Sequence, residues 1–205
     1  MGWQPYFLEK NFDSRSKIYP RINSIVLAIL GFIWILLLFW TDDLIKTSFL
    51  GITFFGSDFF GSLNIIPWIG LSYFFYGFYH LQTPGVFLKS RPKYAAWTRL
   101  FGAFTNIGLC FLLIPIFGAL GAAYATCISF GLMALLMFFI NRYLIFVKLE
   151  YKSLIIIFLL LFISYAAFSV YQDNSTVNLL IMFFYIAVIF YFKIINIQSL
   201  NKIFA

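Results

Sequence analysis

Charged side chains are scarce in this sequence, and their scarcity decides the class of protein. Asp, Glu, Lys and Arg make up only 10% of the 205 residues, whereas 63% of the residues are hydrophobic. Soluble globular domains carry about 25% charged residues, so this composition excludes a soluble domain. We therefore predict a protein that is embedded in a membrane.

Residues that bind metals or form disulfides are also few. The chain has one His and two Cys, and both Cys110 and Cys127 lie in apolar segments. No spacing of His and Cys is typical of a metal site. We expect no metal, no cofactor and no catalytic residue, and we interpret the two cysteines as small core residues.

Long apolar segments make up most of the sequence. Six of them are long enough, or nearly so, to cross about 30 Å of hydrocarbon as helices. They are roughly Ile22–Phe39, Leu63–Leu81, Leu100–Phe117, Ala119–Ile140, Leu154–Val170 and Val177–Phe192. None alternates apolar and polar residues as the strands of a membrane β-barrel do. The sequence predicts an all-α, polytopic membrane bundle of about six transmembrane helices.

The basic residues lie on one side of these segments. Of the 14 Lys and Arg residues, only Lys46 falls in a connection on the opposite side. That side carries four aspartates instead, namely Asp42, Asp43, Asp58 and Asp173. Because cytoplasmic loops are enriched in Lys and Arg, both termini are predicted to be cytoplasmic. The net charge of +7 is then an orientation signal, and we expect no nucleic-acid partner.

Three parts of the chain are distinguished by this pattern. Residues 1–21 are predicted to form a polar cytoplasmic lead-in. Residues 22–152 hold the first four apolar segments, and residues 153–205 hold the last two segments and a cytoplasmic tail. We expect the main cytoplasmic loop at Lys89–Thr98.

The third and fourth segments are predicted to form a tight hairpin. Pro115 is expected to end the third segment, and the turn that follows is so short that the two helices must be antiparallel neighbours. Small side chains then recur every four residues. They are Gly118, Gly121, Ala122, Ala125, Thr126 and Ser129. We predict that the two glycines and two alanines of this set mediate close helix packing.

Four polar residues near or within the apolar segments are candidates for substrate binding. Arg99 begins the third segment, where it either snorkels to lipid headgroups or projects into a cavity. Asn106 lies two helical turns further on the same face and contacts the same cavity or forms an interhelical hydrogen bond. Asn64 and His80 lie near the two ends of the second segment. His80 is a candidate for proton coupling or an ordinary interfacial residue.

Several of these features together resemble a known family. The hairpin sequence LLIPIFGALGAAYAT at Leu112–Thr126 follows Asn106 and the basic loop Lys89–Lys93. With the sequence WQPYFL at Trp3–Leu8, it is similar to the carboxy-terminal half of bacterial polysaccharide flippases. These proteins belong to the superfamily of the multidrug and toxin exporters and the peptidoglycan lipid flippase. The resemblance extends to about Lys152, and the last two segments fit by position as an extra helix pair.

The resemblance implies a transport function and no enzymatic activity. Such flippases move a polyprenyl-diphosphate-linked oligosaccharide across the bacterial inner membrane during biosynthesis of surface polysaccharide such as the O-antigen of lipopolysaccharide. Family members are about twice as long and bind substrate between two six-helix bundles. This chain corresponds to the second bundle, so we expect a fragment or half of a transporter whose partner is an amino-terminal half or a second copy. The extra pair, Leu154–Val170 and Val177–Phe192, is the candidate groove for the lipid tail.

Two other functions remain open from the residues. A membrane polymerase or ligase acting on the same substrate would need acid, base or cationic groups, usually on a sizeable outer loop. The predicted outer connections are short and contain one Lys but no Arg or His. A small-molecule antiporter of the same superfamily would need a buried carboxylate for ion coupling, and no Asp or Glu lies within a predicted span.

The predicted orientation is testable by thiol labelling. Cysteines introduced at Asp43 and Asp173 should react with an impermeant reagent added outside the cell, because both positions lie in the acidic connections. Cysteines at Lys93 and Lys148 should react only after the membrane is permeabilised. Labelling of Asp43 and Lys93 variants from the same side would contradict the topology.

Overall fold

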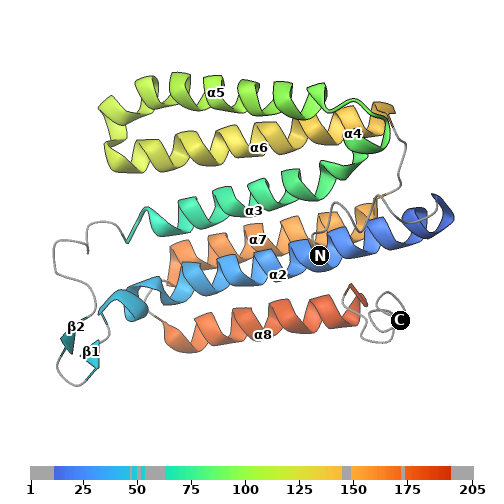
Figure 1. Cartoon of the computed structure of the whole chain (residues 1–205). Helices are drawn as coiled ribbons and strands as arrows, with labels where there is room; N and C mark the ends of the chain where they lie inside the picture. Colours follow the sequence, from blue (N-terminus) through green and yellow to red (C-terminus); the bar gives the residue numbers. More distant parts are fainter. Residues whose placement is uncertain are drawn as a thin grey trace.

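The computed structural model is an all-α bundle, which confirms the predicted fold class (Figure 1). It describes residues 12–46, 48–49, 52–53, 63–144, 149–171 and 174–194. The sequence at Trp3–Leu8, Asp58, Asp173, Lys148 and the end of the predicted cytoplasmic tail lie outside the described residues.

Seven helices and one small hairpin make up the described part of the chain. The helices are α2 (Phe12–Lys46), α3 (Ile66–Gln82), α4 (Pro84–Leu88), α5 (Lys93–Phe117), α6 (Ala119–Leu144), α7 (Tyr151–Tyr171) and α8 (Ser175–Tyr191). The strands β1 (Ser48–Phe49) and β2 (Ile52–Thr53) pair antiparallel. Each of the six predicted spans corresponds to one of the six longer helices.

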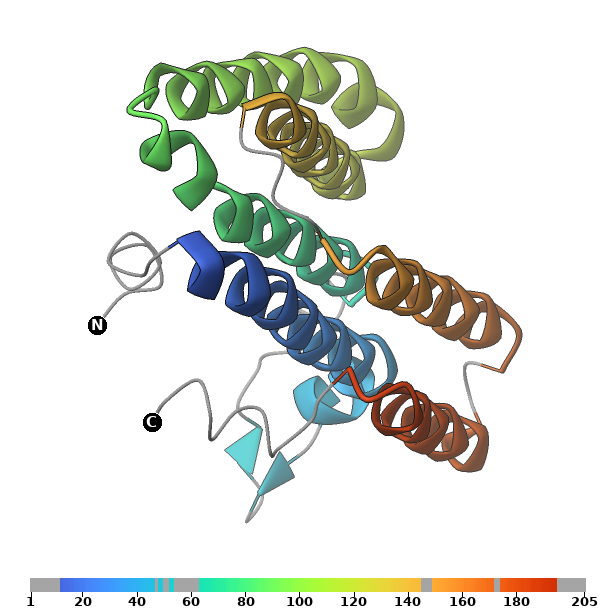
Figure 2. The same cartoon turned by 90° about the vertical axis from the view of Figure 1, so that its right-hand side faces the viewer.

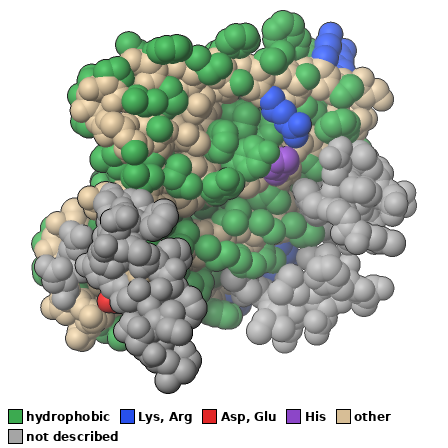
Figure 3. All heavy atoms as spheres, turned by 60° about the vertical axis from the view of Figure 1, so that its left-hand side comes forward, with side chains coloured by type: hydrophobic (Ala, Val, Ile, Leu, Met, Phe, Trp, Pro, Cys, Tyr) green, Lys and Arg blue, Asp and Glu red, His purple; other side chains and the backbone are tan. Residues whose placement is uncertain are grey.

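Four helices are long and apolar enough to cross a membrane. The candidate spans are Tyr19–Asp43, Lys93–Phe117, Ala119–Leu144 and Tyr151–Tyr171. Figure 3 shows hydrophobic side chains spread over much of one face of the molecule. Such a surface suits contact with lipid, and the chain is a multi-helix membrane protein.

The helices α3 and α8 are shorter than the other four. Each has 17 residues, which corresponds to about 25 Å of helix. Beyond α3 the helical path continues, because Thr83 N donates to Tyr79 O at 3.2 Å. The helix α4 then begins at Pro84, which has no N–H and therefore interrupts the hydrogen-bond ladder. The second predicted span is thus a short helix with a proline break at its end.

Two helices begin earlier than the hydropathy predicts. The helix α2 starts at Phe12, ten residues before the predicted start, so half of the expected lead-in is helical. The helix α5 starts at Lys93, within the expected cytoplasmic loop. Pro92 precedes it with φ of −60°, the value that proline favours at a helix start. Hydropathy marks the lipid-facing portion of a helix, whereas polar residues extend the same helix beyond it.

The helix α3 occupies the centre of the arrangement (Figures 1 and 2). One side of α3 packs on α6, which is in turn covered by α5. The other side packs on α2, and α2 also contacts α7 and α8. The extra helix pair is therefore attached to the bundle through α2.

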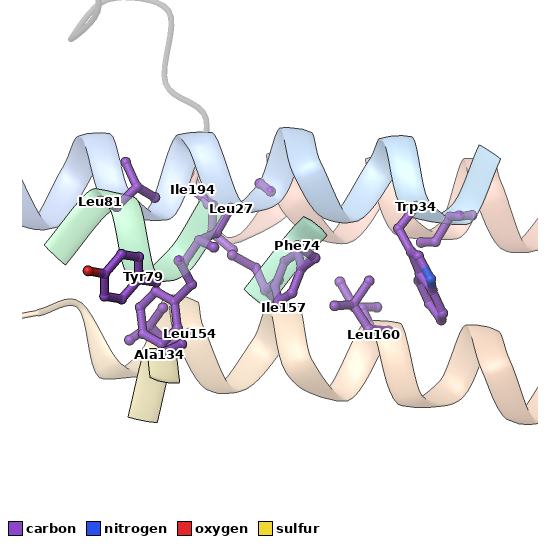
Figure 4. Packing of buried hydrophobic residues seen from close by; sticks show 14 of the residues in the cluster. Leu27, Trp34, Phe74, Tyr79, Leu81, Ala134, Leu154, Ile157, Leu160 and Ile194 are labelled. Carbon is purple, nitrogen blue, oxygen red and sulfur yellow. The ribbon is translucent and has the colours of Figure 1, made fainter. Parts of the chain in front are cut away.

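Aromatic and aliphatic side chains fill the space between α2, α3 and α7. Phe74 of α3 is 1% exposed and lies among buried side chains of α2 and α7, as Figure 4 shows. Hydrogen bonds also join α2 to its neighbours. Trp34 Nε1 donates to Pro67 O at 2.8 Å, and the Tyr185 hydroxyl donates to Ala28 O at 2.8 Å. These bonds tie α2 to α3 and to α8.

The hairpin of α5 and α6 turns at Gly118. This residue has φ of 59° and ψ of −136°, a conformation that other residues rarely adopt. Pro115 was expected to end the third span but lies inside α5, because the helix continues to Phe117 and Gly118 N still donates to Ile114 O at 2.8 Å. A Cβ on Gly118 would meet open space, so this glycine makes the turn and does not pack helices.

Gly121 lies directly against the backbone of α5. A Cβ on Gly121 would lie 2.9 Å from Ile114 N and closer still to the carbonyl group of Leu113. These atoms belong to the backbone of α5, so they have no side-chain rotamer with which to move away. Ala125, one turn further on α6, is fully buried, and Ala122 is half-buried.

A single added methyl group should therefore distinguish two glycines of the hairpin. Gly121→Ala is expected to destabilise the protein by about 1–3 kcal/mol, because the added group forces α5 and α6 apart. Gly108→Ala is the matched control, since a Cβ on this α5 residue meets nothing within 4 Å. Thermal unfolding of the purified variants measures both. Equal unfolding temperatures for wild type, Gly121→Ala and Gly108→Ala would refute the close approach.

Candidate functional site

The two ends of the bundle differ in their charges. We call the end that carries Arg91, Lys93 and Arg99 the cationic end, and the end that carries Asp42 and Asp43 the acidic end. The last turn of α2 and the first turn of α3 lie at the acidic end, whereas the last turn of α3 and the first turn of α5 lie at the cationic end. Each end has its own cluster of polar and aromatic side chains.

Arg99 is fixed at the cationic end by a buried tyrosine. Arg99 Nε donates to the Tyr79 hydroxyl at 3.2 Å, and the guanidinium carbon lies 5.8 Å from the centre of the Tyr79 ring. Tyr79 is fully buried, and its hydroxyl donates to Ala95 O at 3.2 Å. The terminal amino groups of Arg99 have no hydrogen-bond partner among the described residues, and the side chain is exposed. The guanidinium is thus fixed through Nε, whereas its terminal amino groups bind no other described residue.

His80 lies beside this arginine on the same aromatic support. Its ring meets Tyr76 edge to face at 4.4 Å and Tyr79 at 5.5 Å. Tyr76 also stacks on Phe130 of α6 at 4.9 Å. Figure 3 shows the single histidine next to a cationic side chain. The imidazole is exposed, so the structure joins two of the four candidate residues, Arg99 and His80, in one exposed cluster.

Asn106 has a different role from Arg99. Its Nδ2 donates to Thr126 Oγ1 at 3.3 Å across the hairpin, and Thr126 Oγ1 donates to Ala122 O at 2.9 Å. Cys110 Sγ donates to Asn106 Oδ1 at 3.7 Å. The side chain of Asn106 therefore reaches α6, whereas Arg99 reaches α3. Of the two roles predicted for Asn106, the structure shows the interhelical hydrogen bond, and it does not bring Asn106 and Arg99 together in one cavity.

Asn64 lines a cavity at the acidic end. The cavity has a volume of about 430 Å³ and lies between α2, α3, α6 and α7. Its polar residues include Thr41 and Asp42, and its aromatic wall is formed by Trp68, Tyr124 and Tyr165. The sequence analysis missed these aromatic residues, because they come from three helices and no local spacing connects them.

Two apolar crevices run along the helix α7. One, of about 190 Å³, lies between α2, α3 and α7 and shares Pro67, Trp68 and Tyr165 with the cavity at the acidic end. The other, of about 210 Å³, lies between α7 and α8, where the resemblance placed a groove for a lipid tail. Within the described part of the chain, no cluster of His, Cys, Asp and Glu could hold a metal ion.

The chain matches no protein-family model, no curated protein and no solved structure. The resemblance to polysaccharide flippases therefore stays a prediction, and the functional argument rests on the geometry of the two ends.

The Asn106–Thr126 hydrogen bond is testable by a double-mutant cycle. Asn106→Ala and Thr126→Ala should show a coupling energy of about 0.6 kcal/mol, the average for hydrogen bonds between membrane helices. Asn106→Ala combined with Ser169→Ala is the control, since within the described residues Ser169 bonds its own helix, at Ala166 O. Equilibrium unfolding measures each free energy. A coupling no larger than that of the control pair would contradict the interhelical bond.

Proposed function

We propose that this chain is part of a membrane transporter that moves a polyprenyl-diphosphate-linked oligosaccharide from the cytoplasmic to the outer leaflet of the bacterial inner membrane. The observation that carries the proposal is the arrangement of Arg99. The Arg99 guanidinium is anchored through Nε, and its two terminal amino groups, which have no partner among the described residues, offer two parallel donors. Phosphate oxygens are bound by such pairs of donors.

Moving this substrate across the membrane requires solvation of its polar groups and no chemical reaction. A diphosphate and its sugars cannot enter hydrocarbon unaided, because each polar group that loses water without a new partner costs several kcal/mol. A transporter replaces that water with protein donors and acceptors. No bond is made or broken, so the proposal requires no catalytic residue.

The cationic end is the proposed entry side. The positive-inside rule favours a cytoplasmic location for Arg91, Lys93 and Arg99. Exposed basic residues there attract the anionic headgroups of membrane lipids, and Arg99 is the one proposed to bind the substrate. The exposed imidazole of His80 adds a polar group next to the guanidinium.

The crevice between α7 and α8 supports a path for the lipid tail. Its lining includes Leu160, Ile163, Leu180 and Phe184, and it opens between two helices that contact each other and α2. An isoprenoid chain is a flexible apolar ligand that suits such a crevice.

We further propose that transport requires a second bundle, either an amino-terminal half or a second copy of the chain. A headgroup bound by Arg99 needs protein on its other side, because lipid offers no partner for sugar hydroxyls. The close packing of the hairpin at Gly121 joins α5 to α6, which in turn packs on α3.

The role of Arg99 is testable in cells that contain the complete transporter. Arg99→Ala should abolish export of the surface polysaccharide at unchanged protein abundance. Arg99→Lys should be intermediate, because lysine keeps the charge but lacks the planar pair of donors. Export is measured on extracted polysaccharide and abundance by immunoblot.

Lys93→Ala is the matched control, since Lys93 is an exposed cation at the same end and lies only six residues away. It should leave export intact. Full export by Arg99→Ala at wild-type abundance would mean that Arg99 serves only to anchor α5 at the headgroups.

A further inference from the structure

The cavity at the acidic end adjoins the apolar crevice between α2, α3 and α7. The cavity, of about 430 Å³, and the crevice, of about 190 Å³, share Pro67, Trp68 and Tyr165 in their linings. Both spaces lie against the same three helices, and the cavity also reaches α6. The two spaces together therefore suit one ligand with two dissimilar parts.

The lining changes from polar to apolar along two helices. On the side of α3, Asn64 lines the cavity, whereas Leu71 and Phe75 line the crevice further from the acidic end. The helix α7 shows the same change in the opposite chain direction, from Tyr165 in the cavity to Phe158 in the crevice. The polar part thus lies near the membrane surface, and the apolar part lies within the hydrocarbon.

Unused donors surround the polar part. The Trp68 indole N–H and the hydroxyls of Tyr124 and Tyr165 have no hydrogen-bond partner among the described residues, although all three side chains line the cavity. The rings lie together, because Trp68 meets Tyr124 at 4.7 Å and Tyr165 at 5.5 Å. Three donors at one wall favour a ligand with several acceptor oxygens at the level of the membrane interface.

A phospholipid has both parts. The carbonyl oxygens of its esters lie at the interface and accept hydrogen bonds but donate none, whereas its acyl chains lie in the hydrocarbon. The crevice is lined by apolar side chains, and Figure 4 shows one of them, Trp34, pointing from α2 toward α7. A wholly polar ligand would leave this crevice unfilled, and a plain hydrocarbon would leave the three donors without partners.

We propose that a glycerophospholipid binds at the acidic end, with its ester oxygens at Trp68, Tyr124 and Tyr165 and one acyl chain in the crevice. The helices α3 and α7 both pack on α2, and the lipid fills the space between them. No part in binding is assigned to Asp42, which also lines the cavity. The site shares no residue with the crevice between α7 and α8, and it lies at the opposite end from Arg99. It is therefore independent of the proposed transport function.

Ester and ether lipids with the same chains separate hydrogen bonding from burial of the chains. Native mass spectrometry of the 205-residue chain in dodecylmaltoside measures binding of dioleoylphosphatidylcholine. The comparison lipid is the dioleyl ether analogue, which keeps the headgroup and the chains but lacks both carbonyl oxygens. The ester lipid should bind about threefold to tenfold more tightly, the usual effect of one or two hydrogen bonds. Equal affinities for the folded wild type would overturn the proposal.

Variants that remove only donors test the polar part. Trp68→Phe, Tyr124→Phe and Tyr165→Phe combined keep an aromatic ring at each position and remove three donors, so the preference for the ester lipid should fall to about twofold or less. Tyr73→Phe is the matched control, because Tyr73 is 61% exposed on α3 and lines neither space. It should keep the wild-type preference. A folded triple variant with the full preference would overturn the proposal.

A larger side chain in the crevice tests the apolar part. Leu71→Trp should weaken binding of both lipids about tenfold, because the new ring takes the place of the acyl chain and removes its contacts. Leu112→Trp is the control, since Leu112 is 66% exposed on α5 and lines neither space. Unfolding temperatures confirm that each variant is folded. Unchanged binding by folded Leu71→Trp would overturn the proposal, and if this variant fails to fold, the comparison of ester and ether lipids on the wild type still decides.

An isoprenoid competitor distinguishes a resident phospholipid from the lipid carrier. Decaprenol, which has an isoprenoid chain and no ester, should bind more weakly than dioleoylphosphatidylcholine. Tighter binding of decaprenol would overturn the proposal, because the crevice would then fit the carrier of the proposed function. Export by Arg99→Ala tests the transport proposal alone, so either proposal can fail without the other.

Discussion

Lipid tails are as apolar as the side chains that face them, so no hydrophobic force holds these helices together inside a bilayer. Their association depends on close packing and on hydrogen bonds between helices. Gly121 allows the backbones of α5 and α6 to approach, and Gly31 of α2 leaves space for Tyr185, whose hydroxyl would lie 2.6 Å from an added Cβ. Glycine at these positions lets neighbouring atoms come within contact distance, and an added methyl group removes that contact.

The proline break after α3 shows how the bundle satisfies backbone groups that a helix would normally pair. Pro84 cannot donate to His80 O, and the Thr83 hydroxyl bonds that carbonyl at 2.6 Å. Val86 N bonds Thr83 O instead of Gln82 O, and Asn141 Nδ2 of α6 donates to Gln82 O at 2.6 Å. Gln82 Nε2 in turn donates to Ala134 O of α6 at 3.3 Å. Hydrogen bonds with α6 thus compensate for the break. They also fix the position of α3 along α6.

Hydropathy and small-residue spacing were sufficient to predict the helices and the hairpin, because both are properties of one segment. The contacts of the candidate site depend on pairs that are distant in sequence. Nothing near Arg99 in the sequence indicates that its Nε meets the hydroxyl of Tyr79, 20 residues earlier. Trp68, Tyr124 and Tyr165 look like interfacial aromatic residues when each helix is considered alone. Only the packing of α3 between α6 and α2 makes them one wall.

The two ends of the bundle offer opposite chemistry to a single amphipathic molecule. Basic groups at the cationic end favour phosphate, whereas the acidic end carries Asp42 and Asp43. Under the proposed function, the diphosphate leaves Arg99. It then meets no second cation among the described residues that line the cavity at the acidic end. A cation there would hold the diphosphate at the outer side and slow its release, because bound oxygens would have to regain water before leaving.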